Sequence, residues 1–334
     1  VPPADVDYPR AIVRRAARGG LARLPGMKLG LQISSFTWPG GDAAIGETLA
    51  GIVRTADEAG FDSIWVMDHF LQIGSVGAPD EPMLEGMTAL GFMAAHSKRA
   101  RLGLMVGGIH YREAGLWIKA ATTLDVLSGG RAYFGIGAAW NEQESRAWGF
   151  PMPPLGDRFE MLEETLQLAH AAWRGEQGDR ERFDGRHYQA ADPLNAPQAL
   201  SRPHPPILIG GGGERRTLKL VAKYADACNV FGTDPAQLRH KYEVLRRHCE
   251  TVGRDYAEIE KTFLTQVSIT PDGAGRSLTP DAMVERLGRT AEAGAQHAIF
   301  SVRGVTDLSK LELIGRSVIP QLRDVGEASP LSRI

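Results

Sequence analysis

The chain is poor in cysteine and has no long hydrophobic run. Its 334 residues include two cysteines, Cys228 and Cys249, which neither form a disulfide framework nor match the spacing of a zinc site. No apolar stretch reaches the roughly 18 residues of a membrane-spanning helix. The formal net charge of −2 does not favour nucleic acid or an anionic membrane as a partner. We therefore expect a cytoplasmic chain that acts on a small molecule.

Several signatures of catalysis are missing as well. The sequence contains no Gly-x-Ser-x-Gly turn, no His-Glu-x-x-His pair and no clustered Cys/His ligands, so we expect no metal centre. A metal-dependent barrel hydrolase would also need ligands at several strand ends, and only Asp68-His69 offers a pair. The lone Gly135-Ile136-Gly137 lacks the third glycine and the downstream acid of a dinucleotide-binding fingerprint.

Short apolar runs alternate with helical patterns about eight times along the chain. Runs bounded by turn residues predict strands at 28–33, 63–67, 101–106, 132–136, 207–209, 227–230, 263–269 and 298–302. Apolar residues at helical spacing predict helices between them, for example at 45–59, 158–173 and 308–318. Apolar strands separated by helices indicate a parallel sheet covered by helices. Eight such units predict an α/β fold, a (β/α)8 TIM barrel over 27–325, with active residues just after the strands.

Three segments do not fit the repeating units. Residues 1–26 are rich in arginine and predict a poorly ordered N-terminal extension, with a short helix at 8–18 as the alternative. The connections 68–85 and 175–206 are longer than barrel loops usually are, so we expect insertion segments over the carboxyl ends of the strands. The second of these, at about 175–206, should be irregular or form a β-hairpin.

Four consecutive glycines at 210–213 follow one predicted strand and precede a helical pattern that opens at Glu214. Glycine lets an anion approach the backbone closely, and a helix N-terminus presents free N–H groups and partial positive charge. The run therefore predicts a phosphate-binding loop. Arg215 and Arg216 could add charge there or be ordinary surface residues.

Other strand ends also present candidate residues. Asp68 and His69 come directly after the second predicted strand, where a histidine can bind a cofactor or move a proton near neutral pH. The alternative is a histidine satisfied by backbone groups. Val106-Gly107-Gly108 ends the third strand, where glycine permits close approach to a flat ring or simply stops the strand. After the fourth strand, small residues at 137–139 and Asn141 could support a ligand or form a tight turn.

Taken as a set, these segments resemble the bacterial luciferase-like superfamily. The resemblance covers nearly all of 27–320 and rests on MKLGL (27–31), GFDSIWVMDH (60–69), ATTLDVLSGGR (121–131), GIGAAWNE (135–142) and PILIGGG (206–212). The order Asp-His after the second strand and the run LSGGR (127–131) look most like the branch that uses coenzyme F420, a deazaflavin. These two features do not exclude FMN.

The resemblance implies a barrel that binds a deazaflavin or flavin across its C-terminal face. It implies a phosphate held by Ala138, Ala139, Asn141, Gly211, Gly212 and Gly213, with Arg215 nearby. It also implies a non-prolyl cis peptide near 104–107 that supports the ring through Met105, Val106 and Gly107. His69 matches the family histidine near the reactive ring edge, and we expect Asp68 to orient it. Homodimers are common in the superfamily.

One departure concerns Glu113. Relatives often read Tyr-Arg-His-Pro where this chain has Tyr111-Arg112-Glu113-Ala114, so a carboxylate replaces a histidine and becomes a lower-ranked candidate acid. We interpret the chain as an oxidoreductase that transfers a hydride between F420 and a small organic substrate. An apolar or aromatic substrate is expected, because aromatic residues follow several strands: Phe36, Trp38, Trp140 and Phe231.

Two alternatives remain open on the same scaffold. The first is an FMN-dependent monooxygenase, which differs because reduced FMN reacts with oxygen whereas a 5-deazaflavin does so poorly. The second is a catalytically silent flavin-binding protein, in which replacement of His69 would have no kinetic effect.

Overall fold

The computed structural model describes residues 26–176 and 180–323. The expected extension at 1–26, apart from Gly26, and the alternative helix at 8–18 lie outside these residues. Within them, no helix has both the length and the apolar character needed to cross a bilayer.

Nine strands of the described chain form one sheet that closes into a barrel. Their order is β3-β2-β1-β11-β10-β9-β8-β5-β4, and each neighbouring pair is parallel. A parallel bridge between Leu102 and Ala132 joins β3 to the residues before β5 and closes the sheet. The strands are β1 Lys28–Ile33, β2 Ser63–Val66, β3 Arg101–Leu104, β4 Gly107–Gly108, β5 Phe134–Gly137, β8 Ile207–Gly210, β9 Ala227–Phe231, β10 Glu260–Val267 and β11 His297–Val302. The predicted (β/α)8 barrel and all eight predicted strands are confirmed.

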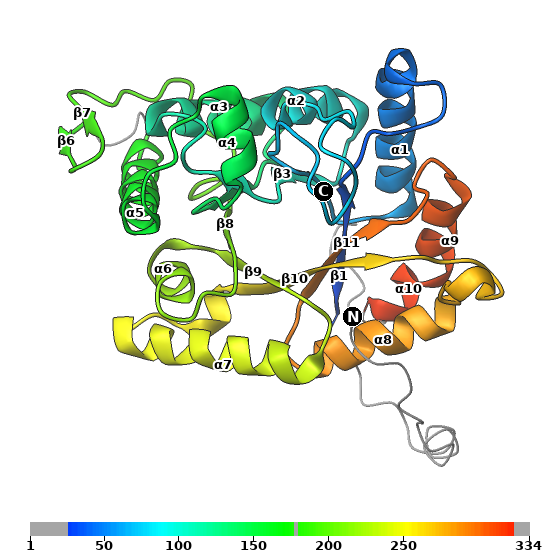
Figure 1. The fold of residues 1–334 in the computed structure, drawn as a ribbon. Coiled ribbons are helices and arrows are strands. Elements are labelled where there is room, and N and C mark those ends of the chain that lie inside the picture. The colour runs from blue at the N-terminus through cyan, green and yellow to red at the C-terminus, as the bar shows by residue number, and fades with distance from the viewer. Residues whose placement is uncertain (1–25, 177–179, 324–334) are drawn as a thin grey trace, which may run out of the picture.

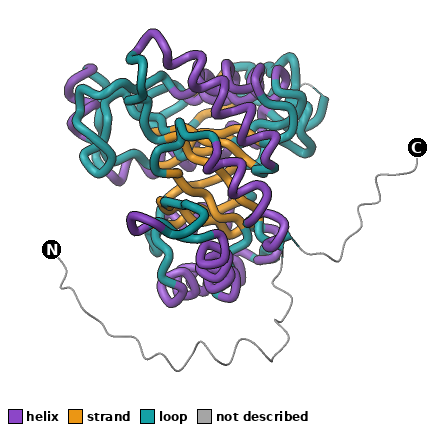
Figure 2. The backbone as a smooth tube through the Cα atoms, turned by 90° about the vertical axis from the view of Figure 1, so that its right-hand side faces the viewer, coloured by secondary structure: helices purple, strands orange, loops and turns teal. Residues whose placement is uncertain are grey.

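Helices surround the strands, as Figures 1 and 2 show. They are α1 Ile45–Ala59, α2 Gly86–His96, α3 Ala114–Leu127, α4 Glu142–Trp148, α5 Leu155–Ala172, α6 Thr217–Tyr224, α7 Pro235–Val252, α8 Pro280–Glu292, α9 Ser309–Ser317 and α10 Ile319–Leu322. In α1 the apolar stripe predicted from the sequence is buried, and Gly60 ends the helix at φ 97°. Helix faces of this kind cover the apolar outer surface of the strands.

The two long connections lie on different parts of the barrel. The segment after β2 reaches the carboxyl end of β1, because Gln72 donates to the Ser34 carbonyl at 3.0 Å and Glu81 accepts from Thr37 at 2.8 Å. The later segment contains a hairpin, β6 Phe183–Asp184 and β7 Gln189–Ala190. Its contacts are with the outer helices: Glu164 of α5 accepts from the N–H groups of 186–188 (Figure 1).

The closing seam of the barrel requires a glycine at one position. Gly135 of β5 lies so close to β3 that an added Cβ would overlap the Leu104 carbonyl oxygen, which is backbone and cannot rotate away. By contrast, Gly91 in the middle of α2 is exposed, and a Cβ there would meet open space.

We predict that Gly135→Ala lowers the free energy of unfolding by about 2 kcal/mol, because the strands at the seam must separate. The matched control, Gly91→Ala, should instead raise it by about 0.5–1 kcal/mol through helix propensity. Urea denaturation of both variants measures the difference. Equal midpoints for Gly135→Ala and the parent chain would show that the seam is looser than described.

Candidate active site

A buried carboxylate organises the carboxyl ends of β2, β4 and β5. Glu144 of α4 has no exposed side-chain surface. One of its oxygens accepts from His69 Nδ1 at 2.6 Å and from the Tyr111 hydroxyl. The other accepts from the backbone N–H groups of Phe70 at 2.8 Å and Leu71 at 3.3 Å. Four donors therefore converge on one carboxylate.

This arrangement fixes the charge of Glu144 and the orientation of His69. Burial alone would raise the pKa of Glu144, but hydrogen bonds from His69 and Tyr111 hold the pKa below its ordinary value. An ionised carboxylate only accepts, so His69 Nδ1 must bear a proton, and Nε2 is the nitrogen left for a ligand. The His69 side chain is 15% exposed, and its ring lies 5.6 Å from that of the exposed Trp140.

Asp68 has a different role from the one expected of it. Both of its oxygens bind the Arg112 guanidinium, at 2.7 and 2.8 Å, and one also accepts from Gly108 N at 3.1 Å. Burial raises the pKa of Asp68 despite its bonds to Arg112, and the pKa of Arg112 is raised by Asp68 and Glu85 although its own burial would lower it. The expectation that Asp68 orients His69 is wrong in this structure, because Glu144 holds the histidine while Asp68 ties β2 to the β4–α3 turn.

Glu113 does not join this cluster. It is the exposed residue that precedes α3, and its side chain makes no capping hydrogen bond. Glu113 lies near the hairpin segment instead, where its charge acts on the Tyr188 hydroxyl. Burial, together with Glu113 and Glu164, raises the pKa of Tyr188 to about 12. Glu113 as a candidate acid beside His69 is therefore unsupported by its position.

The end of β3 contains the expected non-prolyl cis peptide, between Met105 and Val106. The Val106 side chain packs so closely on β8 that a Cβ at Gly210 would come within 2.7 Å of it. A Cβ at Gly107 would overlap the Trp117 ring. Glycines here leave room for the Val106 side chain against β8 and for the Trp117 ring of α3 against β4.

The glycine run after β8 leaves backbone donors free. Gly211 has φ 119° and donates to the Asn229 carbonyl at 2.9 Å. Among the described residues, the N–H groups of Gly212 and Gly213 have no hydrogen-bond partner. A Cβ at Gly212 would meet only the Lys241 side chain, at 3.6 Å. The loop is thus an open cradle of the kind that accepts a phosphate, and it fits the predicted group.

The arginines beside this cradle differ from the sequence expectation. The helix begins at Thr217 rather than at Glu214, so the glycines lead into a turn first. Arg215 is exposed on that turn. Arg216 stacks on Phe159 of α5, with 5.4 Å between the guanidinium carbon and the ring centroid. A role for Arg215 in cofactor binding stays a prediction.

The residues after β5 form a shaped turn. Ala139 has φ 59°, an uncommon conformation for a side chain with a Cβ. Arg158 of α5 holds this turn, since it donates to the carbonyls of Ala138 at 3.1 Å and Ala139 at 2.7 Å. The Asn141 side-chain oxygen accepts from the N–H groups of Gln143 and Glu144 at 3.1 and 3.4 Å and so caps α4.

Glu144 and Arg158 are the site residues that sequence reasoning missed. Glu144 follows the Asn141 cap by three residues, which is the spacing of a capping box. That spacing places Glu144 on the first helical turn, where its side chain can face back toward the preceding strand end. Arg158 has no comparable local signal.

A (β/α)8 barrel with an open glycine cradle, a strand-end cis peptide and a carboxylate-held histidine defines a class of cofactor-binding barrel enzymes. The family described as luciferase-like monooxygenase matches residues 27–297. The chain belongs to this family, and the resemblance seen in the sequence is confirmed.

Individual proteins are similar over most of the chain. The F420-dependent glucose-6-phosphate dehydrogenase of Microbacterium testaceum is 25% identical over 319 residues, covering 80% of this chain and 91% of that protein. The F420-dependent tetrahydromethanopterin reductase of Methanopyrus kandleri superposes with a TM-score of 0.73 at 16% identity, covering 89% of this chain and 100% of that one. The oxygenating constituent of the Pseudomonas putida 3,6-diketocamphane monooxygenase, in complex with FMN, superposes at 0.70 with 17% identity, covering 88% and 98%. The two structures agree on the fold.

We predict that Glu144→Gln lowers the free energy of unfolding by about 1–3 kcal/mol at pH 7, because its amide group must face donors. The folded pKa of Glu144 is depressed, so this contribution is present above the unfolded glutamate pKa of about 4.3. It is lost as the pH falls through the folded pKa.

Denaturant unfolding between pH 7 and pH 3 measures this effect. The gap between parent and Glu144→Gln should therefore narrow below about pH 4. The control is Glu142→Gln on the same helix, whose exposed carboxylate lies 3.5 Å from Arg146. It should change stability by less than about 0.5 kcal/mol. A gap independent of pH would contradict an ionised Glu144.

Proposed function

We propose that the chain is an oxidoreductase that transfers a hydride between coenzyme F420 and a small organic substrate. The observation that carries the proposal is the His69–Glu144 pair at the same barrel end as the Gly211–Gly213 cradle. The name of the Microbacterium relative, which is similar over nearly its whole length, supports F420 as the cofactor. The hydride chemistry itself is supplied by the deazaflavin when it is bound.

The chain's own residues divide the work of binding and proton handling. The free N–H groups of Gly212 and Gly213 would hold a phosphate, and Ala138 and Ala139 would let the ligand lie on backbone. Met105, Val106 and Gly107, around the cis peptide, would support the ring. His69 would present Nε2 to the substrate or the ring and hold or move a proton there, while Glu144 keeps Nδ1 protonated.

Exposed aromatic rings at the same barrel end favour an apolar or aromatic substrate. Trp140 follows β5 and is 64% exposed, and Phe231 at the end of β9 is 68% exposed. The ring of Trp140 lies 5.6 Å from that of His69, so a substrate held at His69 would contact it. The substrate would cover both rings when it binds.

The second candidate is an FMN-dependent monooxygenase. The similarity in fold to the FMN-containing Pseudomonas putida protein favours it, because the same cradle can receive the phosphate of FMN. Oxygen uptake with reduced cofactor distinguishes the two, since reduced FMN consumes oxygen and the deazaflavin does so poorly.

A homodimer and a cytoplasmic location also remain predictions. Sedimentation would test the dimer, which would cover Phe92 of α2 and Leu116 of α3, now 39% and 58% exposed.

We predict that F420 at micromolar concentrations quenches the tryptophan fluorescence of the purified chain. FMN should leave this fluorescence unchanged. His69→Ala should keep F420 binding but lower the rate of substrate-dependent oxidation of reduced F420 by about 100-fold or more, as for loss of a general acid or base. His96→Ala, on the partly exposed end of α2, is the control. FMN binding with oxygen uptake would transfer the assignment to the monooxygenase, and an unchanged rate in His69→Ala would favour a silent binding protein.

We also predict that Gly212→Ala weakens cofactor binding about tenfold without changing stability. The added methyl group meets only Lys241 at van der Waals distance, so the free chain tolerates it. A phosphate seated on the backbone would be pushed away, which costs about 1.4 kcal/mol for each factor of ten. Gly46→Ala on α1, where a Cβ meets open space, is the control in the same titration. Unaltered affinity in Gly212→Ala would place the phosphate elsewhere.

A further inference from the structure

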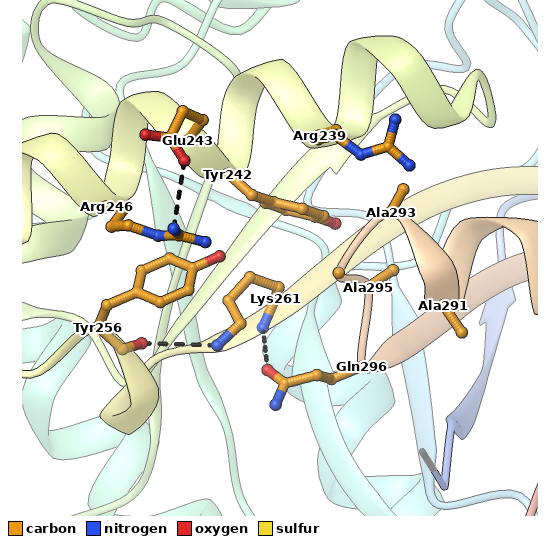
Figure 3. A pocket seen from close by; sticks show the side chains of 11 residues that line it. Arg239, Tyr242, Glu243, Arg246, Tyr256, Lys261, Ala291, Ala293, Ala295 and Gln296 are labelled. Atoms are coloured by element: carbon orange, nitrogen blue, oxygen red, sulfur yellow. Dashed lines mark hydrogen bonds and ion pairs between the residues drawn. The ribbon is translucent and has the colours of Figure 1, made fainter. Parts of the chain in front are cut away.

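A second pocket lies at the opposite end of the barrel from the glycine cradle. It is a cavity of about 300 Å³ between α7, the short turn Tyr256–Glu258, the first residues of β10 and the loop after α8. β10 begins at Glu260, so the pocket is at the amino ends of the strands, whereas the cradle follows the carboxyl end of β8. Figure 3 shows side chains from α7 and from the loop facing each other across Lys261.

The lining of the pocket is positively charged. Arg239, Arg246 and Lys261 line it, and Glu243 is the acid among the lining residues. Glu243 lies 3.6 Å from Arg246, a loose and exposed pair. Arg239 makes no hydrogen bond or ion pair with any residue in the described part of the chain. Arg246 also lies 5.2 Å from the centre of the Tyr256 ring, so among the lining residues one acid and one ring compensate the three cations.

Lys261 is the strongest indication that the pocket can bind an anion. The residue is 5% exposed, although lysine is rarely buried without a partner. Its Nζ has one long hydrogen bond, 3.5 Å to the Tyr256 carbonyl, and lies 4.3 Å from the centre of the Tyr256 ring. The neighbouring carboxylate, Glu260, is already bound by Lys28 at 2.7 Å and by Tyr133 at 2.9 Å. A buried ammonium with so little compensation costs free energy that an anion would recover.

The remaining walls of the pocket are apolar. Tyr242 presents its ring while its hydroxyl is occupied by the Thr262 carbonyl at 3.2 Å. The methyl groups of the alanines in the loop after α8 form the facing side (Figure 3). A free inorganic anion would leave this surface uncovered, whereas an organic anion with an apolar body would cover it.

We propose that this pocket binds a small organic carboxylate, with its anionic group on Lys261 and Arg246 and its apolar body against Tyr242 and the alanine methyl groups. The cavity volume lies at the lower end of the range typical of small-molecule sites, so the cavity suits a compact ligand. This site shares no residue with the proposed cofactor and substrate site, so it stands or falls independently of the proposed oxidoreductase activity.

Calorimetric titration of the full chain with benzoate tests the proposal, with neutral benzamide as the matched probe. Benzoate should bind with a dissociation constant in about the millimolar range, benzamide should not, and added salt should weaken binding. Lys261→Met, which keeps the length of the side chain, should weaken benzoate binding at least about tenfold. Arg246→Met should weaken it as well and is exposed, so it decides the matter if Lys261→Met fails to fold.

Arg289→Met on α8 is the control, because Arg289 is exposed, is paired with Glu285 at 2.7 Å and does not line the cavity. It should leave benzoate binding unchanged. Three results would each overturn the proposal: no benzoate binding, equal binding of benzamide, or benzoate binding that persists unaltered in both pocket variants. The last result would place the carboxylate at another site, such as the carboxyl ends of the strands.

Discussion

The buried carboxylate of Glu144 is the constraint on which the arrangement of the proposed active site depends. A carboxylate with no exposed surface must have every oxygen bonded, and the donors come from two separate segments, 69–71 after β2 and Tyr111 after β4. α4 itself is only seven residues long and gains its N-terminal cap from Asn141. Loss of the Glu144 carboxylate would leave His69, Tyr111 and the N–H groups of 70–71 without their common hydrogen-bond acceptor. The loops after three strands are thus positioned relative to one another by a single side chain.

A second buried carboxylate, Asp68, also connects loops that follow different strands. Asp68 and Arg112 form a two-pronged pair, and Arg112 also lies 4.4 Å from the Trp117 ring, so the β4–α3 turn is held from both sides. Because Asp68 and His69 are adjacent in sequence, the two networks begin at one strand end and diverge. Asp68 pairs with Arg112 and accepts from the Gly108 backbone, while the His69 ring lies 5.6 Å from that of Trp140 and one of its nitrogens stays available.

The fold was accessible from the sequence because its signals are local and repeated. Buried strands such as Ile207–Gly210 are continuous apolar runs, and amphipathic helices such as α1 carry their period in the sequence. The glycine cradle was predicted from its glycine run before a helical pattern, and the cis peptide through the family resemblance. The partners of His69 and Asp68 could not be found in this way, since Glu144 is 75 residues from His69 in sequence and Arg112 is 44 from Asp68. Adjacent residues suggested a pair, but tertiary contacts decided otherwise.

The two ends of the barrel use polar residues for opposite purposes. At the amino ends, buried groups bind each other. The Ser63 hydroxyl lies 2.9 Å from His297 Nε2 and accepts the Trp65 indole N–H at 2.6 Å. The Glu260 carboxylate interacts with His297, Tyr133 and Lys28. Such a network satisfies its members and fills the barrel interior, as expected of a stabilising end. At the carboxyl ends, the N–H groups of Gly212 and Gly213 and His69 Nε2 are left for a ligand. These free groups are what the proposed ligand site at the carboxyl ends requires. Lys261 differs from the buried groups at the amino ends, because its Nζ has one long hydrogen bond, 3.5 Å to the Tyr256 carbonyl.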